Sequence, residues 1–130
     1  MKRIILSLAI VFIALFSANA QERASLTISN TSNYTLTVKV MKQMGGLHAT
    51  LYIPPQQSRI TYFSSTGYFY TKTKAEKSGS FTLYKKDESC FEIVCDSRGY
   101  SEAVMSFYVS EHGGNVGESI SRSEFESNDK

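Results

Sequence analysis

The stretch ASLTISNTSNYTLTVKV, residues 24–40, alternates apolar and polar side chains on both sides of a short polar turn at Asn30 to Asn33. In each half the apolar residues recur at every second position: Leu26 and Ile28, then Tyr34, Leu36, Val38 and Val40. Successive side chains of a β-strand point to opposite faces, so this period places the apolar residues on one face of each strand. The stretch therefore predicts two half-buried strands joined by a turn.

The same alternation continues as far as Ser110. It is seen in HATLYI, RITYF, GYFYTKTKA, FTLYK, CFEIVC and YSEAVMSFYVS. Gly45-Gly46 favours a tight reversal because glycine adopts positive φ, and Pro54-Pro55 ends a strand because proline cannot donate to a ladder. About eight short strands at intervals of roughly ten residues predict an all-β domain, a single antiparallel β-sandwich of the immunoglobulin-like kind. A small closed barrel is the alternative.

The N-terminus has the pattern of an export signal. Lys2 and Arg3 precede an apolar run over residues 4–16, and an Ala-Asn-Ala motif ends at Ala20. Small residues at these positions fit the signal peptidase pocket, so residues 1–20 are predicted to be a signal peptide cleaved after Ala20. The run is shorter than the roughly 20 apolar residues that span a bilayer. We therefore expect a secreted or periplasmic protein with no membrane span in its mature chain.

Loss of the signal peptide changes the charge of the chain. The full sequence has 14 basic and 12 acidic residues, and Lys2 and Arg3 would leave with the leader, so the mature chain carries 12 of each. A neutral chain gains no net attraction to nucleic acid, which argues against a nucleic-acid partner. The charge is unevenly distributed, with a net +3 in residues 21–110 and a net −3 in residues 111–130.

The last twenty residues, 111–130, differ in composition from the rest. They are rich in Ser, Gly, Glu and Asn, and Val116, Ile120 and Phe125 are the members able to bury much apolar surface. Such a composition does not offset the entropy of ordering, so the sequence predicts a disordered polar tail after a β-sandwich domain over residues 21–110. A short helix around Ser119 to Glu126 is the alternative for this region.

The segment GYFYTKTKA, residues 67–75, is the candidate ligand-binding surface. On a strand, one of its faces carries Tyr68, Tyr70, Lys72 and Lys74. Tyrosine rings stack on sugar rings and lysines bind anions, so this face is a hypothetical binding site. The alternative is an ordinary half-buried strand, with Phe69 and Ala75 turned inward, because aromatic residues are favoured in strands for their packing alone.

Cys90 and Cys95 stand five positions apart in CFEIVC, within a segment that favours a strand. Five extended steps cover roughly 16 Å, whereas a disulfide needs Cα atoms within about 7 Å. The spacing therefore argues against an internal bridge, unless the intervening residues form a bulge or hairpin.

The sequence offers little for catalysis or for metal binding. A cysteine nucleophile needs a nearby base, and the two histidines, His48 and His112, are not placed near either cysteine by any motif. A zinc site needs about four convergent ligands with recognisable spacing, and none is present. The carboxylates fall mainly in turns or on outward positions: Asp87, Glu88, Glu92, Asp96 and Glu102. We therefore expect no enzyme, no cofactor and no metal site.

In CDSRGYSEA, residues 95–103, Asp96 is placed to accept a bond from a backbone N–H two residues on, and Gly99 suits a left-handed position. We interpret this segment as a sharp turn that carries Arg98 outward. The alternative is that Asp96 and Arg98 contact a ligand.

Together with the leader, the segments GGLHATLYIPPQQS, YFSSTGYFYTKTKA and CDSRGYSEA make the chain resemble small secreted proteins of unknown function from Bacteroidota-type bacteria. The resemblance covers roughly residues 24–110. It implies a one-domain β-sandwich and no catalytic residues. Our expectation is a non-enzymatic module that binds a protein or a glycan. A structural subunit of a surface assembly is the alternative, and a small hydrolase is a more remote one.

Overall fold

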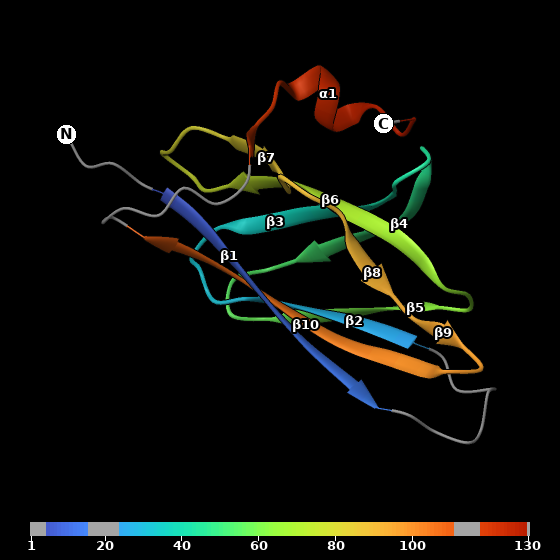
Figure 1. Cartoon of the computed structure of the whole chain (residues 1–130). Coiled ribbons are helices and arrows are strands. Elements are labelled where there is room, and N and C mark those ends of the chain that lie inside the picture. The colour runs from blue at the N-terminus through green and yellow to red at the C-terminus, as the bar shows by residue number, and fades with distance from the viewer. Residues whose placement is uncertain (1–4, 16–23, 111–117, 130) are drawn as a thin grey trace.

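The protein consists of two β-sheets and one short helix (Figure 1). The computed structural model describes the backbone of residues 5–15, 24–110 and 118–129, and the side chains of residues 24–108 and 118–129. The predicted cleavage point after Ala20 lies outside the described residues. Among those residues, no helix is long and apolar enough to cross a membrane. The prediction of an all-β fold is confirmed.

The first sheet has the strand order β1-β10-β2-β5, with β9 also paired to β10. Its strands are β1 (Ile5–Leu15), β2 (Ala24–Asn30), β5 (Ser58–Phe63), β9 (Cys95–Asp96) and β10 (Gly99–Ser110). Strands β2 and β10 run parallel, so the prediction of a purely antiparallel arrangement is wrong. These two strands are far apart in the chain and no hairpin joins them, so no tight turn dictates their relative direction.

The second sheet has the order β11-β7-β6-β3-β4, with β8 also paired to β6, and all of its pairs are antiparallel. Its strands are β3 (Thr35–Lys42), β4 (Leu47–Ile53), β6 (Gly67–Glu76), β7 (Leu83–Lys86), β8 (Phe91–Ile93) and β11 (Glu118–Ser119). Residues 24–110 are described without a gap and contain eight strands longer than two residues, in agreement with the count from the sequence.

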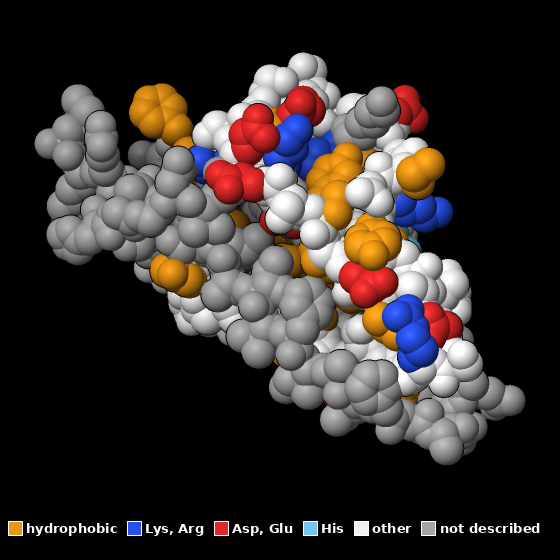
Figure 2. All heavy atoms as spheres, viewed as in Figure 1, with side chains coloured by type: hydrophobic (Ala, Val, Ile, Leu, Met, Phe, Trp, Pro, Cys, Tyr) orange, Lys and Arg blue, Asp and Glu red, His pale blue; other side chains and the backbone are white. Residues whose placement is uncertain are grey.

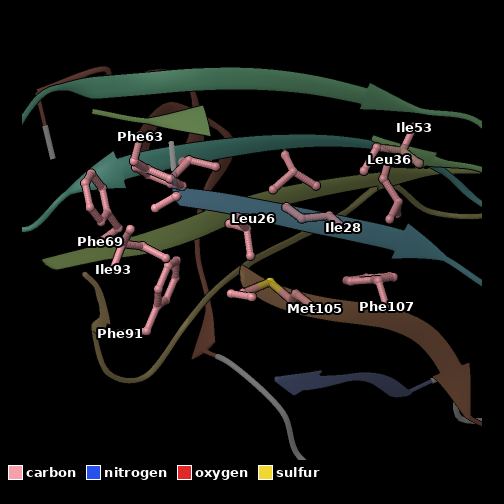
Figure 3. Packing of buried hydrophobic residues seen from close by; sticks show 14 of the residues in the cluster. Leu26, Ile28, Leu36, Ile53, Phe63, Phe69, Phe91, Ile93, Met105 and Phe107 are labelled. Atoms are coloured by element: carbon pink, nitrogen blue, oxygen red, sulfur yellow. The ribbon is translucent and has the colours of Figure 1, made fainter. Parts of the chain in front are cut away.

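The apolar residues of the two sheets form one core (Figure 3). The alternating residues of β2 and β3 are all buried, as their period of two predicts: Leu26, Ile28, Leu36, Val38 and Val40. Figure 3 shows Phe63, Phe69 and Phe91 together at one end of this core. Each fully buried side chain of this size stabilises the fold by about 1.5–3 kcal/mol relative to exposure, so the alternation fixes which face of each strand turns inward.

Asn30 connects the two sheets through its buried side chain. Its Nδ2 donates to the carbonyl oxygens of Tyr34 at 2.7 Å and Ile53 at 3.0 Å, and its Oδ1 accepts from the backbone N–H of Ser32 at 3.0 Å. The carboxamide therefore joins the end of β2 in the first sheet to the start of β3 and the end of β4 in the second. Only a side chain that both donates and accepts satisfies all of these groups.

Replacement of Asn30 by Asp tests this connection, because aspartate has the same shape and its carboxylate has no N–H to donate. We expect Asn30→Asp to lower the free energy of unfolding by about 3 kcal/mol, since it leaves buried carbonyl oxygens without a donor. Urea denaturation at pH 7 measures the loss. Asn33→Asp, at an exposed position of the same turn, is the matched control. Equal losses in the two variants would contradict the role of Asn30.

The C-terminal segment, residues 118–129, is ordered on the outer face of the second sheet, so the prediction of a disordered tail does not hold for it. Strand β11 pairs with β7, and helix α1 (Arg122–Glu126) follows, in the region where the sequence allows a short helix. Ser121 caps α1 by accepting the backbone N–H of Glu124 at 3.1 Å. Residues 111–117 of the predicted tail lie outside the described residues.

Candidate functional site

A cleft of about 610 Å³ opens at one end of the protein, between the β3–β4 turn and the β5–β6 turn. Its apolar wall is formed by Met44, Phe63, Tyr68 and Phe69. Its polar groups come from Lys42, His48, Ser64, Ser65 and Thr66. Tyr68 belongs to the surface predicted from the sequence, whereas Met44, His48 and Phe63 come from other segments that the fold brings beside it.

The β3–β4 turn forms one wall of the cleft. Gly45 and Gly46 have φ angles of 100° and 105°, which confirms the tight reversal predicted at this pair. The Lys42 N–H donates to the Gly46 carbonyl at 2.9 Å and closes the turn. The Gln43 N–H donates to the Tyr68 carbonyl at 2.9 Å, and this bond ties the turn to β6. The wall is therefore fixed at its base, while Met44 at the tip is 94% exposed.

The opposite wall is held by β9 and the turn that follows it. Thr66 Oγ1 donates to Asp96 Oδ2 at 2.6 Å and accepts the Cys95 N–H at 2.8 Å. Asp96 Oδ1 also accepts the Arg98 N–H at 2.9 Å, which confirms the turn predicted in CDSRGYSEA. Hydrogen bonds from the Arg98 and Thr66 side chains hold the pKa of the Asp96 carboxyl well below its usual range. Asp96 therefore positions the β5–β6 turn.

His48 stacks flat on Phe63, with ring centroids 4.3 Å apart and an interplanar angle of 6°, and meets Phe69 edge-on at 5.5 Å. Its Nε2 lies 3.0 Å from the Tyr62 carbonyl oxygen, so Nε2 is the protonated nitrogen that donates. Burial lowers the pKa of the His48 imidazole, and the nearby Lys42 charge acts in the same direction. His48 therefore adds a neutral aromatic ring to the cleft at pH 7, beside the Lys42 side chain.

The four residues predicted as one binding face do not remain one open surface. Tyr68 is 51% exposed beside the cleft, whereas Tyr70 and Lys74 are partly buried and Lys72 is 0% exposed. The prediction that Lys72 is available to a ligand is wrong, because the C-terminal segment covers it. Its Nζ donates to the carbonyl oxygens of Glu124 and Ser127.

Two of the carboxylates considered for catalysis, Asp87 and Asp96, accept hydrogen bonds that hold the structure together. Asp87 accepts the Thr71 N–H at 2.7 Å and the Thr71 hydroxyl at 3.0 Å. Cys90 is a free thiol, and β8 separates it from Cys95 as the extended spacing predicts. Within the part of the chain that the structure describes, no group of three or more His, Cys, Asp or Glu side chains is arranged to hold a metal ion.

A second cleft, of about 630 Å³, lies along the other end of β3 and is lined mainly by polar side chains: Asn33, Thr35, Tyr52, Glu76, Lys77, Ser78 and Thr82. It contains a single aromatic ring, that of Tyr52. Comparisons of the chain with protein-family models, with curated proteins and with solved structures find no match. The geometry of the cleft beside Tyr68 is therefore the basis for proposing its function.

Asp87 makes the stability of the protein depend on pH. Burial raises the pKa of its carboxyl from 3.8 to about 6, so between these values the folded chain binds more protons than the unfolded chain. The contribution of Asp87 to stability is therefore fully present below pH 3.8 and is lost as the pH rises through 6, by about 3 kcal/mol at most.

We expect Asp87→Asn to remove this dependence, because an amide keeps the shape and does not ionise. Urea denaturation of both proteins at several values from pH 4 to pH 7 measures the difference in slope. Glu88→Gln, at the exposed neighbouring position, is the control and should leave the slope unchanged. An unaltered slope in Asp87→Asn would show that other groups set the pH dependence.

Proposed function

We propose that the protein is an exported, non-enzymatic β-sandwich of the immunoglobulin-like type that binds a glycan in the cleft beside Tyr68. The observation that carries this proposal is the composition of the cleft: aromatic rings on its wall and hydroxyl groups on its rim. The leader pattern over residues 1–20 supports export with cleavage after Ala20.

A sugar ring offers an apolar C–H face and a periphery of hydroxyl groups, and the cleft has a counterpart for each. The half-exposed ring of Tyr68 provides a stacking surface beside the cleft. Ser64 and Ser65 are exposed and provide hydroxyls for hydrogen bonds. Ligand sites commonly have volumes of about 300–1,000 Å³, and this cleft falls in that range, large enough for one or two sugar rings.

The absence of a net charge in the mature chain and the neutral His48 favour a neutral ligand over a polyanion at this site. Lys42 is the cation on the lining, and it adds a contact for one carboxylate or for several hydroxyl groups. The polar cleft around Tyr52 is the weaker candidate because one ring cannot enclose a sugar face.

Tyr68→Ala tests the site, with glycan-array screening of the exported protein followed by titration calorimetry on the strongest hit. We expect at least a tenfold loss of affinity, or about 1.4 kcal/mol, because the stacking surface is removed. Tyr52→Ala, in the polar cleft, is the matched control and should bind as the wild type does. A loss of affinity in Tyr52→Ala alone would place the site in the other cleft. If the wild-type protein binds no glycan on the array, the proposed function is refuted.

An assembly subunit is the second candidate, because of the position of β1. This strand pairs with β10 along its whole length, from Ile5 opposite Ser110 to Leu15 opposite Tyr100. Cleavage after Ala20 would remove β1 and leave a long free edge on β10, which is the kind of edge to which a partner adds a strand.

Light scattering of the cleaved protein over a range of concentrations tests this second candidate. Assembly through β10 predicts oligomers that grow with concentration and that Ser106→Lys abolishes, because a charge on an edge strand opposes pairing. A protein that stays monomeric at every concentration, and whose β10 amides exchange rapidly with solvent, would refute the assembly role. Glycan binding would then be the remaining candidate function.

A further inference from the structure

Four lysines gather on the outer face of the second sheet: Lys39, Lys72, Lys74 and Lys86. We call this surface the lysine face. Lys39, Lys72 and Lys86 are direct register partners on the neighbouring strands β3, β6 and β7, so three like charges form one row across the sheet. Like charges directly opposite one another destabilise a sheet, and this face lies away from the core, so packing does not require them. A segment that supplies hydrogen-bond acceptors or negative charge would offset this repulsion.

In the structure the C-terminal segment, residues 118–129, occupies the lysine face. Lys39 Nζ donates to the Phe125 carbonyl at 3.0 Å and to Asn128 Oδ1 at 2.9 Å, and Lys72 Nζ donates to the Glu124 carbonyl at 2.7 Å. These carbonyls belong to the last turn of α1, where a helix leaves its C=O groups without intrahelical partners and carries partial negative charge. The lysines therefore recognise the end of a helix.

Phe125 anchors the segment. Its side chain is 4% exposed, its ring lies 5.5 Å from that of Tyr84, and the Nζ atoms of Lys39 and Lys74 lie 4.9 Å and 5.9 Å from its centroid. Cations over an aromatic face are attracted to it, so the same lysines hold both the ring and the backbone. An aromatic anchor surrounded by polar contacts is the arrangement by which proteins hold peptides.

Acidic side chains complete the contact. Lys86 Nζ lies 3.8 Å from Glu124 Oε1 and 4.0 Å from Glu118 Oε2. Figure 2 shows acidic and basic side chains side by side at the top of the molecule, where α1 lies in Figure 1. The net charge of +3 in residues 21–110 and of −3 in residues 111–130 gives the same complementarity over the whole chain.

We propose that the lysine face is a peptide-docking surface and that its partner is the C-terminal segment of a second copy of this chain. The contacts of the segment are side-chain hydrogen bonds, ring contacts, ion pairs, a two-residue strand pairing and a backbone bond from the Gly46 N–H to the Asp129 carbonyl at 3.1 Å. A segment from another copy would make the same set. Exchanging the segment between two copies therefore changes the free energy little. The ratio of dimer to monomer is set by the protein concentration relative to the effective concentration of the chain's own segment. This inference does not depend on the glycan cleft.

A labelled peptide of residues 118–129 tests the docking surface. The recipient is the full chain carrying Phe125→Ala, whose own segment has lost its anchor. We expect the peptide to bind this variant at least tenfold more tightly than it binds the wild-type protein, whose surface is occupied. The control recipient is Phe81→Ala, which removes a ring that is 91% exposed and should behave as the wild type.

Two further peptides test the specificity of the surface. The same peptide with Phe125 replaced by Ala should bind at least tenfold more weakly than the wild-type peptide. A poly-glutamate peptide of equal length should bind no more tightly than the Ala peptide. Equal binding of the three peptides would show attraction by charge alone and would overturn the proposal. Failure of the wild-type peptide to bind a Phe125→Ala protein that remains folded by circular dichroism would overturn it as well.

The identity of the partner is tested by light scattering on the wild-type protein. Exchange predicts dimers that increase with concentration and are absent from Phe125→Ala; a strictly monomeric protein at millimolar concentration overturns the second copy as partner. If Phe125→Ala does not fold, Glu124→Ala serves as the recipient, because it removes the ion pair of the segment with Lys86 and leaves the lysine face intact. It should bind the labelled peptide more tightly than the wild-type protein does and leave glycan binding unchanged, whereas a defect in the cleft would affect glycan binding alone.

Discussion

The buried carboxamide of Asn30 is the interaction on which the arrangement of the two sheets depends. Burial of Leu26 and Leu36 brings apolar faces together without fixing their relative position, because the hydrophobic effect has no direction. Asn30 supplies the direction: it donates to carbonyl oxygens of Tyr34 and Ile53 in the second sheet while its own strand belongs to the first. The backbone N–H of Asn30 also donates to the Gln57 carbonyl at 2.8 Å, so the β4–β5 connection is held at the same point.

The alternation of side chains was sufficient to predict the strands, and it was not sufficient to predict how they pair. A period of two identifies the buried face of β2 or β10, but it carries no information on which strand lies beside another or in which direction. The C-terminal segment shows a different limit. Its composition is polar and its one buried ring is Phe125, so its order depends on Lys39 and Lys72, which lie more than fifty positions earlier in the chain.

The candidate site was predicted in part, for the same reason. The sequence predicts that Tyr68 and Lys72 share an open face; Tyr68 lies beside the cleft, whereas Lys72 is covered. Residues on one face of a strand share a direction, but they do not share an environment once another segment packs over half of that face. His48 and Phe63 had no local signal, because their contact arises from the stacking of rings on two strands that meet only in the fold.

The parallel pairing of β2 with β10 has a consequence for the order of events during biosynthesis. Strand β2, near the start of the chain, and β10, the last long strand, are register partners, with Ser25 opposite Glu102, so the central pair of the first sheet cannot form until almost the whole polypeptide is available. Contacts of such large sequence separation close slowly, because the entropy of a long loop is lost before any interaction compensates for it. A nascent chain of this topology therefore completes the first sheet only after synthesis has passed Phe107, the last residue of β10 that pairs with β2.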